Sequence, residues 1–134
     1  MSNTEKLFRR HLSTVTTNQK EWLSLFDDDA VVEFPFAKEI GFPDRIEGLP
    51  NIQKYIESLP AGFEDFEFSD VKIYPHENAD SLTAEFKGFI PGNSERPEYR
   101  QTYICSFSAK NGKITHYKEY WDPTAVTKFF GGAR

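Results

Sequence analysis

The segment HYKEYWDP, residues 116–123, holds an ionisable side chain between two large aromatic ones. Successive side chains of a β-strand point to opposite faces, so Tyr117, Glu119 and Trp121 are expected on one face. A carboxylate between aromatic walls loses hydration, and this raises its pKa toward the range used in acid–base catalysis. The alternative is an ion pair between Glu119 and a cation such as Arg100 on the facing strand. Proton transfer by Glu119 is the chemistry that this pattern predicts most directly.

Tyrosine hydroxyls near this carboxylate could hold a ligand oxygen. Tyr55 and Tyr117 can each donate a hydrogen bond, although buried tyrosines often satisfy polar groups of the core instead. Asp122 is also acidic, but Asp-Pro ahead of a helical run is typical of a helix N-cap. Its side chain would also point away from the face that carries Glu119. Asp122 is therefore interpreted as a capping residue.

Metal and nucleotide sites are not expected. His11, His76 and His116 are far apart in the sequence, and Cys105 is the single cysteine, so no metal-ligand spacing is present. The sequence contains neither a Gly-rich phosphate loop nor a G-x-S-x-G nucleophile motif. We therefore expect no cofactor and no metal, and we expect Cys105 to be a small buried side chain.

Length and composition indicate one domain spanning residues 1–134. The net charge of −5 argues against nucleic acid as a partner, because nucleic-acid-binding proteins carry a basic surface. No apolar stretch approaches the length of a membrane span, and the N-terminus lacks the apolar core of a signal peptide. With a single cysteine, these features predict a cytoplasmic protein without membrane contact. Aromatic residues make up 16% of the chain, and so many rings must fill a core, a pocket or an interface.

Hydrophobic periodicity changes along the chain. Before residue 63, helical intervals predict helices that begin at Ser2, at Asn18 and near Leu49, with the run DDDA ending the second helix and an extended stretch over 31–36. After it, alternation predicts four strands, FEFSDVKIY, SLTAEFKGFI, EYRQTYICSFSA and KITHYKEYW, and a last helix over 124–130. Helices followed by hairpin-connected strands predict an α+β fold in which helices cover one side of a sheet.

The Asn111–Gly112 turn sets the expected pairing of the last two strands. A two-residue turn pairs Lys110 with Lys113, and counting back from it places Ile104 opposite Glu119. One face then collects Thr102, Ile104, Ser106, Tyr117, Glu119 and Trp121, and the other collects Tyr103, Cys105, Phe107, His116, Lys118 and Tyr120. Both faces are amphipathic, so alternation alone leaves open which of them faces the core.

Three segments in this order, LFDDDAVVEFPF, EGLPNIQKYI and KNGKITHYKEYWDP, resemble the landmarks of the nuclear transport factor 2-like superfamily. Its SnoaL-like polyketide cyclases, ketosteroid isomerases and phenazine-biosynthesis A/B proteins look most similar. The resemblance implies a cone-shaped, curved antiparallel (mixed) sheet that wraps around N-terminal helices and encloses one apolar pocket. It also implies a homodimer that forms through the sheet. It also implies that Trp121 lines the pocket, as do Phe34 and Tyr55, and that Glu119 and Tyr117 point into it.

The departures from the ketosteroid isomerases argue against steroid isomerisation. Phe34 stands where the resemblance places their general base, and Ile104 lies near the position of their oxyanion-binding aspartate. Their oxyanion-binding tyrosine falls near Arg10 or His11. In the phenazine A/B proteins, the acidic catalytic residue looks equivalent to Glu119, whereas Tyr55 matches the position of their histidine.

These observations predict a cofactor-free lyase, cyclase or isomerase acting on a small apolar carbonyl or ring compound. Glu119 would shuttle a proton, and Tyr55 and Tyr117 would hold an oxygen atom. The expected pocket wall comprises Trp121, Phe34, Phe36, Phe63, Ile104 and His11. The alternative is a protein of the same fold that binds a small molecule without transforming it. In a third hypothesis the aromatic residues form a protein interface, and no enclosed pocket is expected.

Overall fold

The first two helices begin at polar capping side chains. In the computed structural model, which describes residues 2–59 and 63–130, helix α1 (Asn3–Thr14) begins at Ser2, whose hydroxyl accepts the Glu5 N–H at 3.0 Å. Helix α2 (Gln19–Ser24) begins at Asn18, whose side chain accepts the Glu21 N–H at 3.0 Å. Each contact satisfies an N–H group that the helix itself leaves without a partner. Both predicted helix starts are confirmed.

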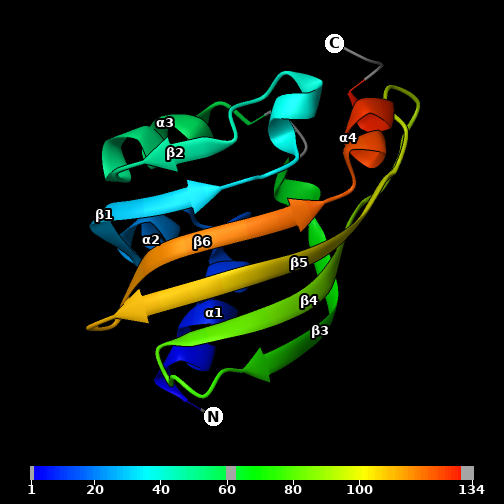
Figure 1. The fold of residues 1–134 in the computed structure, drawn as a ribbon. Helices are drawn as coiled ribbons and strands as arrows, with labels where there is room; N and C mark the ends of the chain where they lie inside the picture. The colour runs from blue at the N-terminus through cyan, green and yellow to red at the C-terminus, as the bar shows by residue number, and fades with distance from the viewer. Residues whose placement is uncertain (1, 60–62, 131–134) are drawn as a thin grey trace.

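Six strands form one curved sheet in the described part of the chain (Figure 1). They are β1 (Phe26–Glu33), β2 (Arg45–Glu47), β3 (Glu67–Pro75), β4 (Ser81–Ile90), β5 (Tyr99–Lys110) and β6 (Lys113–Trp121), in the order β2-β1-β6-β5-β4-β3. Strands β1 and β6 run parallel, and all other neighbours are antiparallel. The predicted α+β class with a curved, mixed sheet is confirmed.

Strand β1 begins earlier than the sequence pattern predicts. The acidic run 27–29 was expected to end the second helix, but it lies inside β1. Phe26 and Ala30 are buried on either side of this run, while the side chains of Asp28 and Asp29 are exposed. The buried positions anchor the strand, and the acidic side chains between them remain in water.

In the described residues, two further α-helices and two short 3₁₀ helices connect or follow the strands. They are η1 (Ala37–Ile40), α3 (Leu49–Glu57), η2 (Phe63–Asp65) and α4 (Pro123–Phe129). The carboxylate of Asp122 accepts the Thr124 N–H at 2.9 Å, which confirms its interpretation as the N-cap of α4. The sequence also predicts that Pro60–Ala61–Gly62 ends the third helix and that Gly131–Gly132 ends the last one, and both segments lie outside the described residues.

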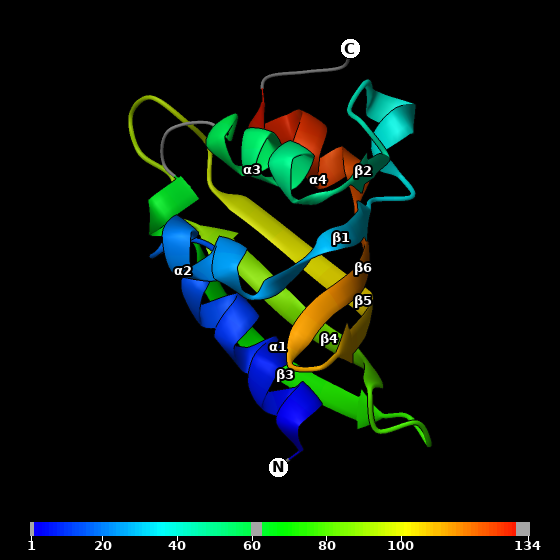
Figure 2. The same cartoon turned by 90° about the vertical axis from the view of Figure 1, so that its left-hand side faces the viewer.

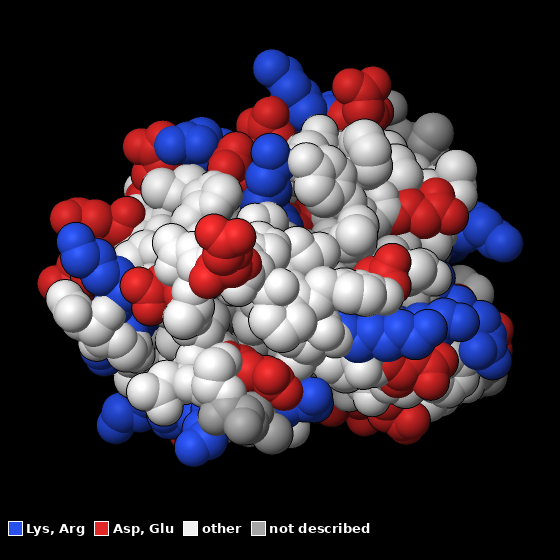
Figure 3. Space-filling view, turned by 60° about the horizontal axis from the view of Figure 1, so that its bottom comes forward, with Lys and Arg blue, Asp and Glu red and all other residues white. Residues whose placement is uncertain are grey.

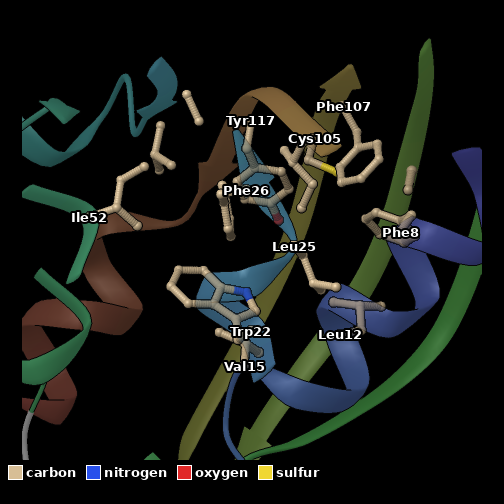
Figure 4. Close-up of a cluster of buried hydrophobic side chains, with 14 of the residues drawn as sticks. Phe8, Leu12, Val15, Trp22, Leu25, Phe26, Ile52, Cys105, Phe107 and Tyr117 are labelled. Atoms are coloured by element: carbon tan, nitrogen blue, oxygen red, sulfur yellow. The ribbon is translucent and has the colours of Figure 1, made fainter. Parts of the chain in front are cut away.

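The helices close the concave side of the sheet. Figure 2 shows α1 and α2 on one side of the sheet, with α3 and α4 near one end. Side chains from α1, α2 and the sheet, including Trp22, Phe26 and Tyr117, converge in the core (Figure 4). Phe8 packs edge-on against Phe107 with their ring centroids 5.3 Å apart. The helices therefore fill one part of the concave surface, and the rest of it is available for a cavity.

Strand β6 contains one residue more than a regular hairpin needs. The turn pairs Lys110 with Lys113, as predicted, but the register shifts between Ser108 and Ala109. Thr115 is the additional residue, and its hydroxyl donates to the Ser108 carbonyl at 3.2 Å. This β-bulge changes which residues of β5 share a face with those of β6, because side chains alternate with a period of two.

The bulge makes the predicted pairing of the last two strands wrong. Cys105, rather than Ile104, lies opposite Glu119, and Ile104 pairs with Tyr120. The inner face of these strands therefore carries Tyr103, Cys105, Phe107, Tyr117, Glu119 and Trp121. The thiol of Cys105 is buried, as expected, and burial raises its pKa to about 12. Ile104 is 42% exposed on the outer face.

Gly88 of β4 closely approaches two aromatic rings. A Cβ atom at this position would lie 2.3 Å from Cε1 of Phe66 and 2.9 Å from Cε2 of Tyr103. We expect Gly88→Ala to lower the free energy of unfolding by about 1–3 kcal/mol, because the added methyl group displaces well-packed rings. Urea unfolding measures the change. Lys87→Ala, at the exposed neighbouring position, is the control and should change stability by less than about 0.5 kcal/mol. Equal stability of the two variants would contradict this close packing.

The surface carries charges of both signs. On the face shown in Figure 3, Lys and Arg groups are interspersed with Asp and Glu groups around a central uncharged area. Exposed ion pairs include Arg10–Glu21 at 3.1 Å and Arg96–Asp65 at 3.1 Å, and pairs of this kind add little stability. Over residues 2–59 and 63–130, no helix has the length and apolar character needed to cross a membrane.

Candidate active site

A cavity of about 490 Å³ lies between the inner face of the sheet and the helices. Its walls are mostly aromatic and aliphatic side chains. The ionisable groups among them are His11, Glu119 and four tyrosines, Tyr55, Tyr99, Tyr103 and Tyr117. None of the described lining residues is Lys or Arg. The presence of this cavity contradicts the third hypothesis, in which the aromatic residues form a protein interface and no enclosed pocket is expected.

The structure places seven of the nine predicted site residues around this cavity. They are Glu119, Tyr55, Tyr117, Trp121, Phe34, Phe63 and His11. Phe36 is not among them, because β1 ends at Glu33 and the expected alternation does not continue that far. The Phe36 ring is instead 44% exposed and packs edge-on against Tyr120. Ile104 also lies outside the cavity, because the bulge in β6 turns its side chain to the outer face.

Glu119 lies at the cavity wall without a cationic partner in the described structure. The Tyr117 hydroxyl donates a hydrogen bond to its Oε2 atom. Burial raises the pKa of the Glu119 carboxyl to about 7, although the bond from Tyr117 acts in the opposite direction. Arg100 forms an ion pair with Glu98 at 2.5 Å and lies over the Phe89 ring, so the alternative Glu119–Arg100 pair is absent. At neutral pH the carboxyl can therefore both accept and return a proton.

His11 of α1 is held in one neutral form. Its Nδ1 atom accepts a hydrogen bond from the Trp22 Nε1–H at 2.9 Å, which assigns the ring proton to Nε2. Burial lowers the pKa of His11 to about 3, so the ring carries no charge near neutral pH. Its ring centroid lies 4.6 Å from that of Tyr117. His11 thus supports the position of Tyr117 and adds no charge to the cavity.

Tyr55 and Trp121 belong to an aromatic wall near Glu119. The Phe34 ring lies 5.4 Å from the Tyr55 ring and 6.3 Å from the Trp121 ring, measured between centroids. Burial raises the pKa of Tyr55, and the charge of Glu119 raises it further. The Tyr55 hydroxyl therefore remains protonated and can donate a hydrogen bond to a ligand.

Tyr99 and Tyr103 also line the cavity, although they were not among the predicted site residues. Both lie on the inner face of β5, and burial raises the pKa of each hydroxyl. Their alternation with Cys105 was visible in the sequence. Counting from the turn without a bulge places Tyr103 and Cys105 on the face opposite Glu119, so the sequence pattern does not indicate that Tyr103 lines the cavity.

The fold agrees with comparisons to known proteins. The sequence profile of the SnoaL-like domain matches residues 8–117. The chain belongs to the SnoaL-like family. The uncharacterized protein YesE of Bacillus subtilis is 35% identical over 116 residues, which cover 87% of this chain and 78% of YesE. The PhzA/B-like protein PA3332 of Pseudomonas aeruginosa is 29% identical over 111 residues, or 83% of this chain and 77% of PA3332. The predicted family is confirmed.

Solved structures of similar proteins share the whole architecture of this SnoaL-like protein. A candidate isomerase from Bacillus subtilis is 31% identical, with a TM-score of 0.84 over 98% of this chain and 94% of the other. RV0760c from Mycobacterium tuberculosis, in complex with estradiol-17β-hemisuccinate, is 17% identical, with a TM-score of 0.73 over 93% and 98%. The epoxide hydrolase/cyclase-like enzyme SalBIII is 14% identical, with a TM-score of 0.73 over 91% and 92%. The last two comparisons show a common fold alone.

Proposed function

We propose that this SnoaL-like protein is an enzyme of the lyase, cyclase or isomerase type that moves a proton on a small apolar carbonyl or ring compound. Glu119 removes a proton from carbon next to a carbonyl group and returns it to the same or another atom. Tyr117 holds the carboxyl through its hydrogen bond, and Tyr55 can donate to a ligand oxygen. Glu119 gains one proton when the enolate forms and gives the same proton back to the enolate, so no further reactant is needed.

The observation that carries this proposal is a carboxyl group with a pKa of about 7 at the wall of an apolar cavity. A group whose pKa lies near the working pH is present in both protonation states and is the most effective general acid–base catalyst. Purely structural carboxylates are usually paired with cations or fully exposed to water, whereas Glu119 is half-buried at the wall of an apolar cavity and has no cationic partner in the described structure. The names of the similar proteins, a candidate isomerase and a cyclase-like enzyme, are compatible with this class of chemistry.

The cavity also limits the ligand class. Its volume of about 490 Å³ accommodates a compound of two to four fused rings, and its lining is largely apolar. A similar protein, RV0760c, has been solved in complex with estradiol-17β-hemisuccinate, whose four-ring steroid part has this size and apolar character. Because the described lining contains no Lys or Arg, the ligand within the cavity is expected to be uncharged.

The pH dependence of proton exchange tests this proposal. With 2-tetralone, a bicyclic ketone, as the probe, proton NMR in deuterated buffer follows loss of the hydrogens beside the carbonyl. The catalysed rate should fall about tenfold per pH unit below pH 7 and level off above it, because only the Glu119 carboxylate removes a proton. A midpoint near pH 4.5, or no catalysed exchange, would contradict the assignment to Glu119.

A second candidate function is the binding of a small molecule without turnover. Phe34 supports it, because this apolar ring lines the cavity at the position where the resemblance to the ketosteroid isomerases places their general base. In that case 2-tetralone would bind, would be recovered unchanged and would exchange its hydrogens no faster than in buffer. Catalysed exchange would exclude this alternative for the probe.

The predicted homodimer through the sheet stays a prediction. Its support is a pair of exposed apolar side chains, Ile104 on the outer face of β5 and Phe36 in the segment that follows β1. Tyr120 lies between them, since it pairs with Ile104 and contacts the Phe36 ring. This small apolar patch is the part of the outer face that a second copy of the chain would cover.

A further inference from the structure

His11 and Trp22 form a buried pair between the first two helices. Trp22 of α2 donates its indole N–H to the Nδ1 atom of His11 of α1 at 2.9 Å. An indole nitrogen can only donate, so Nδ1 is the acceptor and carries no proton. A protonated imidazole has no acceptor position, so this bond also requires the neutral ring. The bond from Trp22 therefore leaves His11 with a single ring proton, which is on Nε2.

The Nε2–H group of His11 faces the cavity. Within residues 2–59 and 63–130, the structure shows no acceptor within hydrogen-bond distance of this nitrogen. In the same part of the chain, every buried side-chain nitrogen or oxygen that is fully enclosed by protein has a hydrogen-bond partner. Nε2 is therefore not fully enclosed, although His11 as a whole is only 4% exposed. Because His11 lines the cavity, the open space beside Nε2 is the cavity itself.

The His11 ring is held in one orientation. Measured between centroids, it lies 4.6 Å from the ring of Tyr117, 5.7 Å from Phe8, 6.2 Å from Trp22 and 6.3 Å from Phe107. This packing and the bond from Trp22 together fix the direction of the Nε2–H group. A tyrosine hydroxyl differs, because it rotates and can accept as well as donate. His11 thus presents to the cavity a donor with one direction and no acceptor.

Tyr117 connects this donor to the proposed base. Its ring contacts His11, and its hydroxyl donates a hydrogen bond to Glu119. All three residues line the same cavity. Only one side chain therefore lies between the His11 donor and the Glu119 carboxyl. A carbonyl oxygen and the C–H group next to it belong to one small part of a ligand, so they can contact His11 and Glu119 together.

We infer that the Trp22–His11 pair binds the carbonyl oxygen of the ligand, with Nε2–H of His11 as the donor and Trp22 as the positioning residue that keeps the proton on that nitrogen. This inference rests on the proposed function and names the oxygen-binding group within it. The hydrogen bond strengthens when the carbonyl oxygen becomes an enolate oxygen, because the acceptor then carries negative charge. The Nε2 proton stays on His11 throughout, and Glu119 takes the proton that leaves carbon.

Nitrogen-15 NMR of the histidine rings in the native protein tests the donor directly. At pH 7, His11 should show an unprotonated Nδ1 and a protonated Nε2, and the absence of its signals in His11→Asn assigns them. Addition of 2-tetralone should shift the Nε2–H signals. Tetralin, in which a methylene group replaces the carbonyl group, should shift them much less. A proton on Nδ1, equal shifts with both compounds, or no shift with 2-tetralone overturns the inference.

His11→Phe measures the contribution of the donor to binding. Without the N–H group the carbonyl oxygen lacks a partner in an apolar cavity, so the dissociation constant of 2-tetralone should rise about tenfold. That of tetralin should stay within about threefold, because its contacts are apolar. Tyr120→Phe removes a hydroxyl outside the cavity and should change neither value. An equal loss of affinity for both compounds overturns the inference, and the NMR result on the native protein decides it if His11→Phe does not fold.

Trp22→Phe tests the positioning role of Trp22. Nδ1 then has no donor, so the ring proton should distribute between the two nitrogens and both nitrogen-15 signals should move to intermediate values. Addition of 2-tetralone should return the proton to Nε2, because the carbonyl group accepts from that nitrogen alone. Intermediate values that 2-tetralone leaves unchanged overturn the inference.

Two variants distinguish this inference from the proposed function. Glu119→Gln should keep the response of Nε2–H to 2-tetralone, because His11 donates independently of Glu119, and should lose proton exchange. His11→Phe should lower exchange of bound 2-tetralone by about 10²-fold, since the enolate oxygen loses its donor. Native exchange in a folded His11→Phe protein would overturn the role of His11 alone, whereas native exchange in Glu119→Gln would overturn the proposed function.

Discussion

Replacing Glu119 with Gln should lower catalysed proton exchange of 2-tetralone by about 10²- to 10⁴-fold at pH 8. The amide has nearly the shape of the carboxyl group and can still accept the hydrogen bond from Tyr117. It cannot take up a proton at this pH, so the chemical step is lost while the cavity keeps its form. Proton NMR of the hydrogens beside the carbonyl measures both rates under identical conditions.

Glu33→Gln is the matched control for this substitution. Glu33 lies on β1 outside the cavity, and its carboxylate is paired with His116 at 2.5 Å and Arg45 at 3.4 Å. The hydrogen bond from His116 is the main reason that the pKa of Glu33 is lowered. Its replacement should leave the exchange rate within about twofold of the native value. If Glu119→Gln retained the native rate, another group would be the base and the proposed role of Glu119 would be wrong.

The stability of the native protein should change little between pH 4.5 and pH 6.5, because two cavity groups respond to pH in opposite directions. The folded-state pKa of Glu119 is raised from 4.5 to about 7, so its protonation stabilises the fold and this contribution is lost as the pH rises toward 7. The folded-state pKa of His11 is lowered from 6.5 to about 3, so its contribution is present above pH 6.5 and is lost as the pH falls. In the shared range each slope is about 1.4 kcal/mol per pH unit, with opposite sign.

Single variants should reveal the two hidden slopes. On acidification from pH 6.5 to 4.5, Glu119→Gln should lose about 2 kcal/mol of unfolding free energy, and His11→Asn should gain about as much, because each group titrates only in part at one end of this range. The asparagine oxygen can still accept the Trp22 N–H, so that contact is kept without a titrating group. Urea unfolding at three pH values measures the slopes. The double variant should again be nearly independent of pH, and parallel curves for all four proteins would show that neither group is responsible.

Local sequence signals predicted the elements of the fold wherever one residue type decides the backbone. Ser2 and Asn18 begin their helices by accepting backbone N–H groups. Asp122 does the same for α4, and Asn111 adopts the positive φ that the hairpin turn requires. The start of β1 was not predictable in this way. Asp27–Asp29 are poor strand formers, and the burial of Phe26 and Ala30 that overrides them is a tertiary effect.

Site residues could be predicted from the sequence where their positions depend on alternation within one strand, and not where they depend on the pairing of two strands. Tyr117, Glu119 and Trp121 share a face because they are successive alternate residues of one strand, and no other segment influences that relation. Tyr55 was assigned to the cavity by family resemblance. Tyr99 and Tyr103 could not be placed at the cavity from pattern alone, because the bulge at Thr115 decides which face of β5 points inward. Such a shift becomes visible only when the strands are placed side by side.

The additional residue at Thr115 also bears on how related sequences diverge. An alternating strand has only two phases, so a single insertion or deletion near the hairpin exchanges the inward and outward sets of an entire strand. Loss of one residue here would bring Thr102, Ile104 and Ser106 to face the cavity and turn Tyr103 and Cys105 toward solvent. Chains that are nearly identical residue by residue could then accept chemically different ligands. A change of one residue in the length of this hairpin could therefore change ligand specificity during evolution. A comparison that counts only substitutions would not detect such a change.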